Sequence, residues 1–292
     1  KTTMSFAINL VDNKLKLIGE KFNNIFAFLP TSVSVYALPF IVNANFITDA
    51  GRQNLHQDYV WNQWLFEEMP KRFVEWMAEL AKSKQYGLDY LKLIVKDAGA
   101  NDELSSSYKK GIESALLSTP ILPREDDQLV LVKDAIWDQT NICSFVTKQL
   151  FVKYINKDSK SFVEANILPR KYLFVEKSLK SLGVYTFTEE SLVEFMKSDE
   201  FVNNHSVSEN SGLIDFLTKR YPFNKQSENR DHSWLKDLTF VYNNREILST
   251  PESLCFPNSQ YSSEYSDDID YIHENVFSSL SEESIDWLSH LG

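Results

Sequence analysis

The sequence predicts an α/β fold of mixed α+β type, in which helices cover a β-sheet. Two observations lead to this prediction. Short apolar runs bounded by turn signals, typical of strands, fill residues 4–48. A long stretch follows whose apolar residues recur at helical spacing. The chain has 292 residues, 43% of them apolar and 24% charged, which is the composition of a soluble globular protein with room for two domains.

The N-terminal part is expected to contain four strands. Residues 4–18 predict a β-hairpin, because two apolar runs flank Asp12-Asn13, a strong turn signal. Residues 24–31 predict a third strand, closed by Pro30, and residues 37–48 predict a fourth. Apolar residues in these runs are mixed with polar ones and do not alternate cleanly, which indicates a sheet covered on at least one face.

Residues 58–84 predict an amphipathic helix with one broad apolar stripe. Asp58 is the expected N-cap. Pro70 lies inside the helix, where it should kink or restart it. Three tryptophans share the stripe, and we expect them to pack against the sheet as core residues, although they also fit a ligand cage; they are Trp61, Trp64 and Trp76.

Two lobes are predicted. Residues 1–100 form the first, and the polar stretch 97–107 is the expected linker. The second, residues 101–292, contains two similar units, 116–136 and 235–254. Each unit has a helix, a short apolar strand, a polar turn and a second strand, which together make a helix-hairpin.

Further helices are predicted in the second lobe. Thr188 precedes two glutamates and is a credible start for one of them. The chain ends in a short amphipathic segment. The expected helical ranges between the two hairpins are 142–155, 189–197 and 211–221.

The charge is distributed unevenly along the chain. The net charge is -11, and no Lys or Arg follows Arg245, whereas ten acids do. The preceding 245 residues are nearly neutral, with 30 bases against 31 acids. No basic face stands out, so nucleic acid is an unlikely partner by charge. We expect the acidic end to be a solvated face that aids solubility; a docking surface for a basic partner is the alternative.

Most motifs that carry chemistry are absent. The glycines stand alone, so no phosphate-binding loop is present. The histidines are isolated, and none has metal-ligand spacing with a cysteine or with another histidine. Cys143 and Cys255 are expected to be reduced thiols of a cytoplasmic protein. No apolar run approaches the ~20 residues that a membrane helix needs. We therefore expect neither a metal site nor membrane association.

Arg52 is the residue with the most chemical interest. It follows Gly51, where the backbone can bend sharply, and it lies between an apolar strand and a helix. In α/β folds such positions present side chains to ligands. An arginine there can stabilise the charge that develops in phosphoryl transfer. The residues alone favour a plainer alternative, a surface arginine paired with Asp49 or Asp58.

The stretch from Phe26 to Met69 resembles the block that follows the ATP-binding domain in sacsin-like members of the GHKL ATPase superfamily. The family pattern is F-x-F-L-P, then G-L-P-F-x-[IV]-N-[AG]-x-F, an arginine, and W-N-x-x-[LI]. Ala37 replaces the usual glycine, and Gln53 stands where many relatives carry an acid. The matching residues are Phe26, Phe28, Leu29, Pro30, Leu38, Pro39, Phe40, Val42, Asn43, Ala44, Phe46, Arg52, Trp61, Asn62 and Leu65.

This resemblance implies a role in a larger ATPase. The N-terminal lobe would resemble the middle domain of the ninety-kilodalton heat-shock chaperone, and Arg52 would contact the phosphate of ATP held by an upstream domain. Asn43 and Asn45 would hold the loop by side-chain hydrogen bonds. The fragment alone would bind no cofactor, because ATP and magnesium belong to the full-length protein. The implied partners are the upstream ATP-binding domain and a protein partner or client; homodimerisation is left open.

Two points of interpretation stay open. The chain begins at Lys1 and enters a strand-like stretch at once, which suggests a fragment of a longer polypeptide, although a tag or processing also explains it. The alternative function is a non-catalytic interaction scaffold in a bacterial defence or DNA-processing system, with Arg52 in a structural role. An autonomous enzyme is the least supported reading, because no catalytic constellation is present.

Overall fold

The computed structural model describes residues 2–18, 23–158, 160–223, 233–257 and 269–292. The fold is mixed α/β, as predicted. The chain divides into two compact units. Unit 1 comprises residues 1–139 and 161–187, and unit 2 comprises residues 140–160 and 188–292. This division differs from the expected boundary near residue 100.

Unit 1 is built on a four-stranded sheet in the order β1-β6-β4-β5. β1 (Ser5–Ala7) pairs antiparallel with β6 (Ile41–Asn43), and β6 pairs parallel with β4 (Ile25–Ala27). β4 turns directly into β5 (Leu29–Pro30), an antiparallel neighbour. The expected hairpin is confirmed: β2 (Asn9–Val11) pairs with β3 (Lys14–Lys16) across a turn in which Asp12 and Asn13 both have positive φ.

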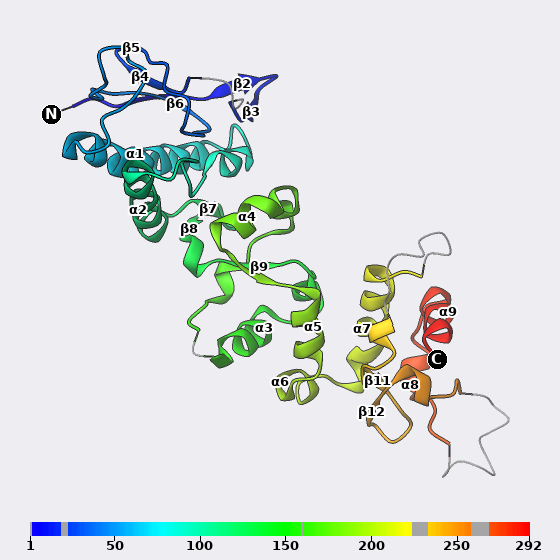
Figure 1. The fold of residues 1–292 in the computed structure, drawn as a ribbon. Helices are drawn as coiled ribbons and strands as arrows, with labels where there is room; N and C mark the ends of the chain where they lie inside the picture. Colours follow the sequence, from blue (N-terminus) through cyan, green and yellow to red (C-terminus); the bar gives the residue numbers. More distant parts are fainter. Residues whose placement is uncertain (1, 19–22, 159, 224–232, 258–268) are drawn as a thin grey trace. The chain divides into compact units, whose positions relative to one another are not determined.

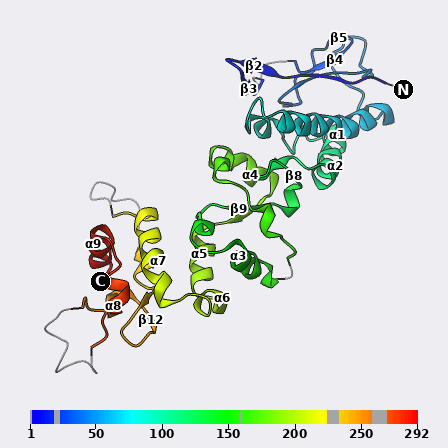
Figure 2. The same ribbon diagram turned by 180° about the vertical axis from the view of Figure 1, so that it is seen from behind.

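One helix, α1 (Val60–Ser83), runs beneath this sheet (Figures 1 and 2). Phe73 on α1 stacks against Phe40 from the segment before β6, with ring centroids 3.9 Å apart. Pro70 lies inside α1, yet the helix continues through it and does not restart. The expected N-cap is wrong by one residue, because Tyr59 occupies that position without a side-chain cap bond.

The tryptophan prediction holds only in part. Trp76 is partly buried and stacks on Phe6, with ring centroids 6.3 Å apart. Trp61 and Trp64 are 39% and 43% exposed, so they are not core residues. Both lie in the first turns of α1, where the buried face is supplied by Asn62, Leu65 and Phe66.

The stretch 97–107 is not a linker, because it begins the next helix of the same core. Asp102 caps α2 (Glu103–Ser118) by accepting a hydrogen bond from the Ser105 amide. α2 packs against α1 so closely that a Cβ on Gly111 would clash with the Glu67 carbonyl oxygen. The first unit therefore continues past residue 100.

The remainder of unit 1 begins with a second hairpin and is completed by a returning segment. β7 (Leu122–Pro123) and β8 (Leu129–Val130) pair antiparallel, as predicted for residues 116–136. The returning segment adds a strand parallel to one in the first part of the chain. The other elements are η1 (Asp89–Leu93), η2 (Val132–Asp134), β9 (Ile136–Asp138), η5 (Glu164–Asn166), η6 (Arg170–Val175), α4 (Glu176–Leu182) and β10 (Tyr185–Phe187).

Unit 2 is mainly helical. Thr188 caps α5 (Glu189–Met196), as predicted. The hairpin expected in residues 235–254 is also confirmed, as β11 (Val241–Tyr242) and β12 (Leu248–Ser249). The first hairpin lies in unit 1 and this one in unit 2, whereas both were expected in one lobe. The other elements are η3 (Ile142–Ser144), α3 (Lys148–Ile155), η4 (Asn156–Asp158), α6 (Asp199–Val202), α7 (Val207–Arg220), η7 (Ser233–Leu235), η8 (Pro251–Ser253), α8 (Glu274–Phe277) and α9 (Glu282–Leu291).

The C-terminal helix α9 is fastened to α7. The Ser284 hydroxyl donates to Asp215 Oδ1 at 2.6 Å, and Trp287 Nε1 donates to the Tyr221 carbonyl at 2.8 Å. Part of the acidic end, residues 258–268, lies outside the described residues. Cys143 and Cys255 are not joined in a disulfide. Within the described ranges, every helix is too short or too polar to cross a membrane.

Candidate functional site

Arg52 lies at the tip of a short loop between the sheet and α1, which we call the Arg52 loop (residues 47–56). Thr48 and Leu55 form an isolated antiparallel bridge at its base. Asp49 closes it, because its carboxylate accepts from the Gln53 amide at 2.8 Å and from the Asn54 side chain at 2.9 Å. The hydrogen bonds from Asn54 and Gln53 also lower the pKa of the Asp49 carboxyl.

The left-handed backbone conformation falls on Arg52 itself, with φ at 56°, and not on Gly51 as expected. Few non-glycine residues adopt positive φ, and each does so at some cost in free energy. The surrounding hydrogen bonds must therefore stabilise this conformation. The Arg52 side chain reaches back to the sheet, where the guanidinium donates to main-chain carbonyls.

Asn62 attaches the Arg52 loop to α1. This side chain is fully buried in the third position of the helix. Its amide nitrogen donates to the carbonyls of Ile47 and His56, at 2.7 and 2.9 Å, and its oxygen accepts from the Ile47 amide at 2.9 Å. All three bonds join the two ends of the loop to one helix turn. The loop is therefore anchored to the core at its base.

The Arg52 guanidinium holds the tight turn between β4 and β5, which we call the Phe28 turn (residues 27–30). Nη2 donates to the carbonyls of Ala27 at 2.8 Å and Leu29 at 2.7 Å, and Nε donates to the carbonyl of Pro30 at 3.3 Å. The main chain adds a further link, because the Ser32 amide donates to the Arg52 carbonyl at 2.9 Å. One side chain thus satisfies three carbonyls of the turn.

Asn43 holds the same turn from the other side. Its Oδ1 accepts from the Phe28 amide at 3.0 Å, and Phe28 has positive φ, at 64°. As a result the turn projects two apolar side chains outward: Phe28 is 76% exposed and Leu29 is 64% exposed. Asn43 therefore does hold a loop by a side-chain hydrogen bond, although the loop is the Phe28 turn and not the one that carries Arg52.

Asn45 has a different role from the one expected. Its side chain is exposed and makes none of the hydrogen bonds described here, while its carbonyl accepts from Trp61 Nε1 at 2.7 Å. This bond orients the exposed Trp61 ring, whose centroid lies 5.2 Å from that of Trp64. Asn43 and Asn45 are two residues apart, so their Cα atoms lie at most about 7 Å from each other. They nevertheless bond to different parts of unit 1, Asn43 to the Phe28 turn and Asn45 to Trp61.

The ion-pair alternative for Arg52 is not what the structure shows. Among the described residues, Arg52 makes no salt bridge with Asp49, Asp58 or another acid; its partners are main-chain carbonyls. The described residues also include no group of three or more His, Cys, Asp or Glu side chains that could hold a metal ion. The chemistry available here is cationic and apolar.

Sequence reasoning singled out Arg52 and Asn43 but missed Phe28 and Leu29 as surface residues. Both stood in an apolar run that reads as a continuous strand. The signal that a turn interrupts it would have been Asn43, a polar residue opposite that run. The role of Asn43 can be recognised only from its hydrogen bond with the Phe28 amide, fifteen positions away in the chain.

Comparison with known proteins gives one partial likeness of note. The chain is 31% identical over 109 residues to Protein NO VEIN of Arabidopsis thaliana. The match covers 35% of this chain and 4% of that protein, so the chain spans a small part of its relative's length. No family model matches the chain, and no solved structure does.

Proposed function

We propose that this chain is the segment that follows the ATP-binding domain in a sacsin-like GHKL ATPase, and that it couples the nucleotide state of that domain to partner or client binding. The observation that supports this proposal is the set of three hydrogen bonds by which Arg52 fixes the Phe28 turn. In the proposed arrangement Phe28 and Leu29 dock against the upstream domain. A cytoplasmic location is part of the proposal.

The hydrogen bonds of Arg52 limit how it could serve a nucleotide. Nε and Nη2 are engaged with carbonyls, so this edge of the guanidinium cannot form a two-bonded contact with a phosphate while the turn is intact. No described residue accepts a hydrogen bond from Nη1, which leaves that nitrogen for a single phosphate oxygen. Arg52 is half-buried and has no carboxylate partner among the described residues, so its positive charge is not neutralised locally.

A path from this turn into the fold supports the coupling role. The Phe28 turn is joined to the Arg52 loop through the guanidinium, and the Arg52 loop is joined to α1 through Asn62. ATP and magnesium would be bound by the upstream domain, and hydrolysis there would supply the change in charge. A displacement of the turn would pass along this chain of hydrogen bonds to α1 and then to α2, which lies against it.

The test measures ATP turnover of the complete protein with substitutions at the two parts of the site. Arg52→Ala removes the three hydrogen bonds. Arg52→Lys keeps the positive charge but lacks the planar group of N–H donors that a guanidinium has. Phe28→Ala removes only the docking side chain. We expect all three to lower turnover, with Arg52→Lys close to Arg52→Ala. An exposed arginine of α1 gives the control, Arg72→Ala, which should leave turnover unchanged.

The outcomes separate three roles. A large loss with Arg52→Ala, recovery with Arg52→Lys and no effect of Phe28→Ala would mean a direct phosphate contact instead of a docking turn. Normal turnover in all three variants would contradict the coupling proposal. In that case the interaction scaffold is the better function, and the outward-facing Phe28 and Leu29 are the observation that favours it.

A further inference from the structure

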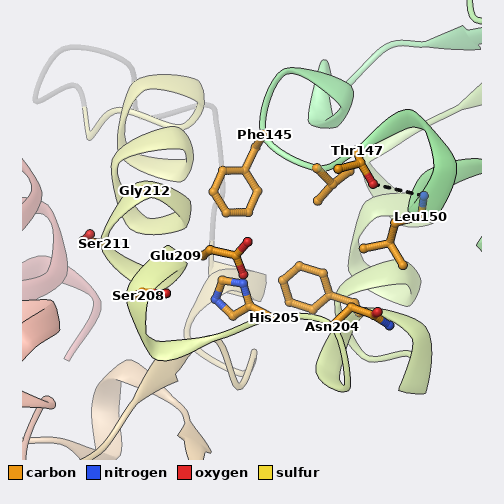
Figure 3. Close-up of a pocket in the computed structure, with 11 residues that line it drawn as sticks. Phe145, Thr147, Leu150, Asn204, His205, Ser208, Glu209, Ser211 and Gly212 are labelled. Carbon is orange, nitrogen blue, oxygen red and sulfur yellow. Dashed lines mark hydrogen bonds between the residues drawn. The ribbon is translucent and has the colours of Figure 1, made fainter.

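A second site lies in unit 2 and is independent of the function proposed above. A pocket of about 480 Å³ opens between the start of α3, the end of α6 and the first turns of α7 (Figure 3). Pockets of ~300–1,000 Å³ are the size that small organic ligands occupy. The lining combines apolar walls with polar side chains, which are Thr147, Asn204, His205, Ser208, Glu209 and Ser211.

The walls are aromatic and aliphatic. Phe145, Leu150 and Phe201 all line the pocket. The Phe145 ring lies against α7 at Gly212, where a Cβ would be 3.4 Å from Phe145 Cε2, about an ordinary van der Waals contact. Phe145 also stacks on Phe216, at 6.1 Å between ring centroids, which holds the ring in place. A flat apolar group fits between such walls.

His205 supplies a hydrogen-bond donor. Asn210 Oδ1 accepts from the Tyr242 amide, so Nδ2 of Asn210 is the donor to the Phe240 carbonyl and to His205 Nε2. His205 Nε2 is therefore an acceptor, and the proton of the neutral ring is on Nδ1. His205 is 8% exposed, and no described residue accepts from Nδ1. This donor is available to a ligand.

The His205 ring is held firmly in this orientation. It stacks on Phe201 and Tyr242, with ring centroids 4.9 and 5.8 Å away. Burial lowers its pKa to about 4, although the charge of Glu209 acts in the opposite direction. The ring is thus neutral near pH 7 and does not repel a cation.

Glu209 is the one charged side chain among the residues that line the pocket. Its Oε2 accepts from the Ser206 amide at 3.1 Å and from the Ser206 hydroxyl at 2.8 Å, which completes the capping box of α7. No described residue donates to Oε1. Among the described residues, no Lys or Arg lines the pocket. Glu209 is thus the full charge that the described lining of the pocket supplies, and a carboxylate favours a cation.

We propose that this pocket binds a small organic cation: a protonated amine on an aromatic body that also carries a hydroxyl group. The ammonium group pairs with Glu209 Oε1, and the aromatic body lies between Phe145 and Phe201. The hydroxyl oxygen accepts from His205 Nδ1. The rings of the wall add an attraction for the charged end.

The experiment titrates tyramine into the intact chain by isothermal calorimetry. Tyramine carries the amine, the ring and the hydroxyl, whereas phenethylamine lacks the hydroxyl. Tyrosol replaces the amine by an alcohol, and 3-(4-hydroxyphenyl)propionate replaces it by a carboxylate. We expect saturable binding of tyramine, weaker binding of phenethylamine and tyrosol, and no detectable binding of the carboxylate.

Glu209→Gln is the decisive variant, because glutamine also completes a capping box and should leave the helix start intact. We expect it to weaken tyramine binding about tenfold or more, as a lost charge-assisted bond does, and to leave tyrosol binding unchanged. Glu194→Gln is the matched control: this exposed glutamate of α5 does not line the pocket. It should leave tyramine binding unchanged.

Three results would overturn the proposal. One is the absence of saturable binding by tyramine. Another is equal affinity for tyramine and tyrosol, which would show that the positive charge is not recognised. The third is an equal loss of tyramine affinity in Glu194→Gln and Glu209→Gln. That result would show that binding depends on the net charge of unit 2 and not on a contact with Glu209. Amide spectra of both variants check that the fold is retained.

Discussion

Arg52 joins two segments of unit 1 through its main chain and its side chain together. Its guanidinium satisfies three carbonyls of the Phe28 turn, while its own carbonyl accepts from Ser32. A lysine has a single ammonium group at the end of a flexible stem and does not match three carbonyls in this way. The geometry therefore explains a requirement for arginine here, whether or not a phosphate is ever present.

We expect Arg52→Ala to lower the free energy of unfolding by about 2 kcal/mol, because hydrogen bonds that involve a charged group contribute about 1.5–3 kcal/mol. Both residues carry a Cβ, so the strain of the positive φ is present in each and cancels. Urea unfolding of the two proteins measures the difference. Arg72→Ala is the control, since Arg72 is an exposed residue of a surface ion pair and should cost less than about 1 kcal/mol. Equal losses in the two variants would contradict the structural role.

His205 makes the stability of unit 2 depend on pH. Its pKa falls from 6.5 to about 4 because the ring is buried. Below pH 6.5 the unfolded chain takes up a proton that the folded ring does not. The free energy of unfolding therefore decreases as the pH is lowered from about 6.5 to about 4. We expect a slope of up to about 1.4 kcal/mol for each pH unit in this window. His205→Phe keeps the ring stacking and should remove this part of the slope; an unchanged slope in that variant would contradict the assignment.

α1 and α2 meet where each departs from an ordinary helical sequence. Pro70 has no amide hydrogen and cannot donate to the carbonyl four residues before it. Gly111 faces this part of α1, where a Cβ would lie 2.7 Å from Pro70 Cγ and closer still to the Glu67 carbonyl oxygen. The glycine thus allows the two backbones to approach.

Gly111→Ala should therefore destabilise the protein, although alanine is the better helix former by about 1 kcal/mol. The added methyl group would meet backbone atoms that cannot move independently, and overpacking of this kind costs about 1–3 kcal/mol. We expect a net loss of up to about 2 kcal/mol in urea unfolding. Gly212→Ala on α7 is the control, because its Cβ meets only Phe145 Cε2 at 3.4 Å. Greater stability of Gly111→Ala than of the parent would show that the helices are not so close.

Local patterns predicted the elements whose cause is local. The hairpin at Asp12-Asn13 needs only two residues that accept positive φ, and the Thr188 cap needs only a hydroxyl before a helix. The predictions that were wrong concern segments whose packing partners lie far away in the sequence. The polar stretch 97–107 reads as a linker until α2 is seen against α1. Trp61 and Trp64 share the apolar stripe, but other residues supply the buried face of the first turns of α1, namely Asn62, Leu65 and Phe66.

The candidate site followed the same rule. Arg52 could be singled out because it is a cation directly after a glycine. Asn43 could be singled out because it is an amide within an apolar strand. Their partners could not be predicted, since Arg52 bonds to carbonyls more than twenty positions away. The pocket around His205 was missed altogether. His205 is isolated in the sequence, and its environment is built from α6, α7 and the segment before α3.

At the scale of the whole chain, unit 1 is discontinuous, which no boundary read from composition could predict. Residues 161–187 return to complete it, because β10 pairs parallel with β9. Two further bonds fasten this segment to the first part: the Leu168 amide donates to the Ile136 carbonyl at 2.7 Å, and the Tyr172 hydroxyl donates to the Pro123 carbonyl at 3.2 Å. The division depends on pairing between segments far apart in sequence.

The division into two units predicts which helices lose protection from amide exchange when a core residue of one unit is replaced. Leu179 in α4 and Leu213 in α7 are both fully buried, the first in unit 1 and the second in unit 2. Replacing a buried leucine by alanine costs about 2–5 kcal/mol. Because each unit has its own core, we expect Leu179→Ala to speed amide hydrogen exchange in α1 and α2, far away in sequence, while α7 stays protected. Leu213→Ala should do the reverse. If Leu179→Ala instead loosened residues 140–160 and left α1 protected, the returning segment would belong with its sequence neighbours and the two-unit division would be wrong.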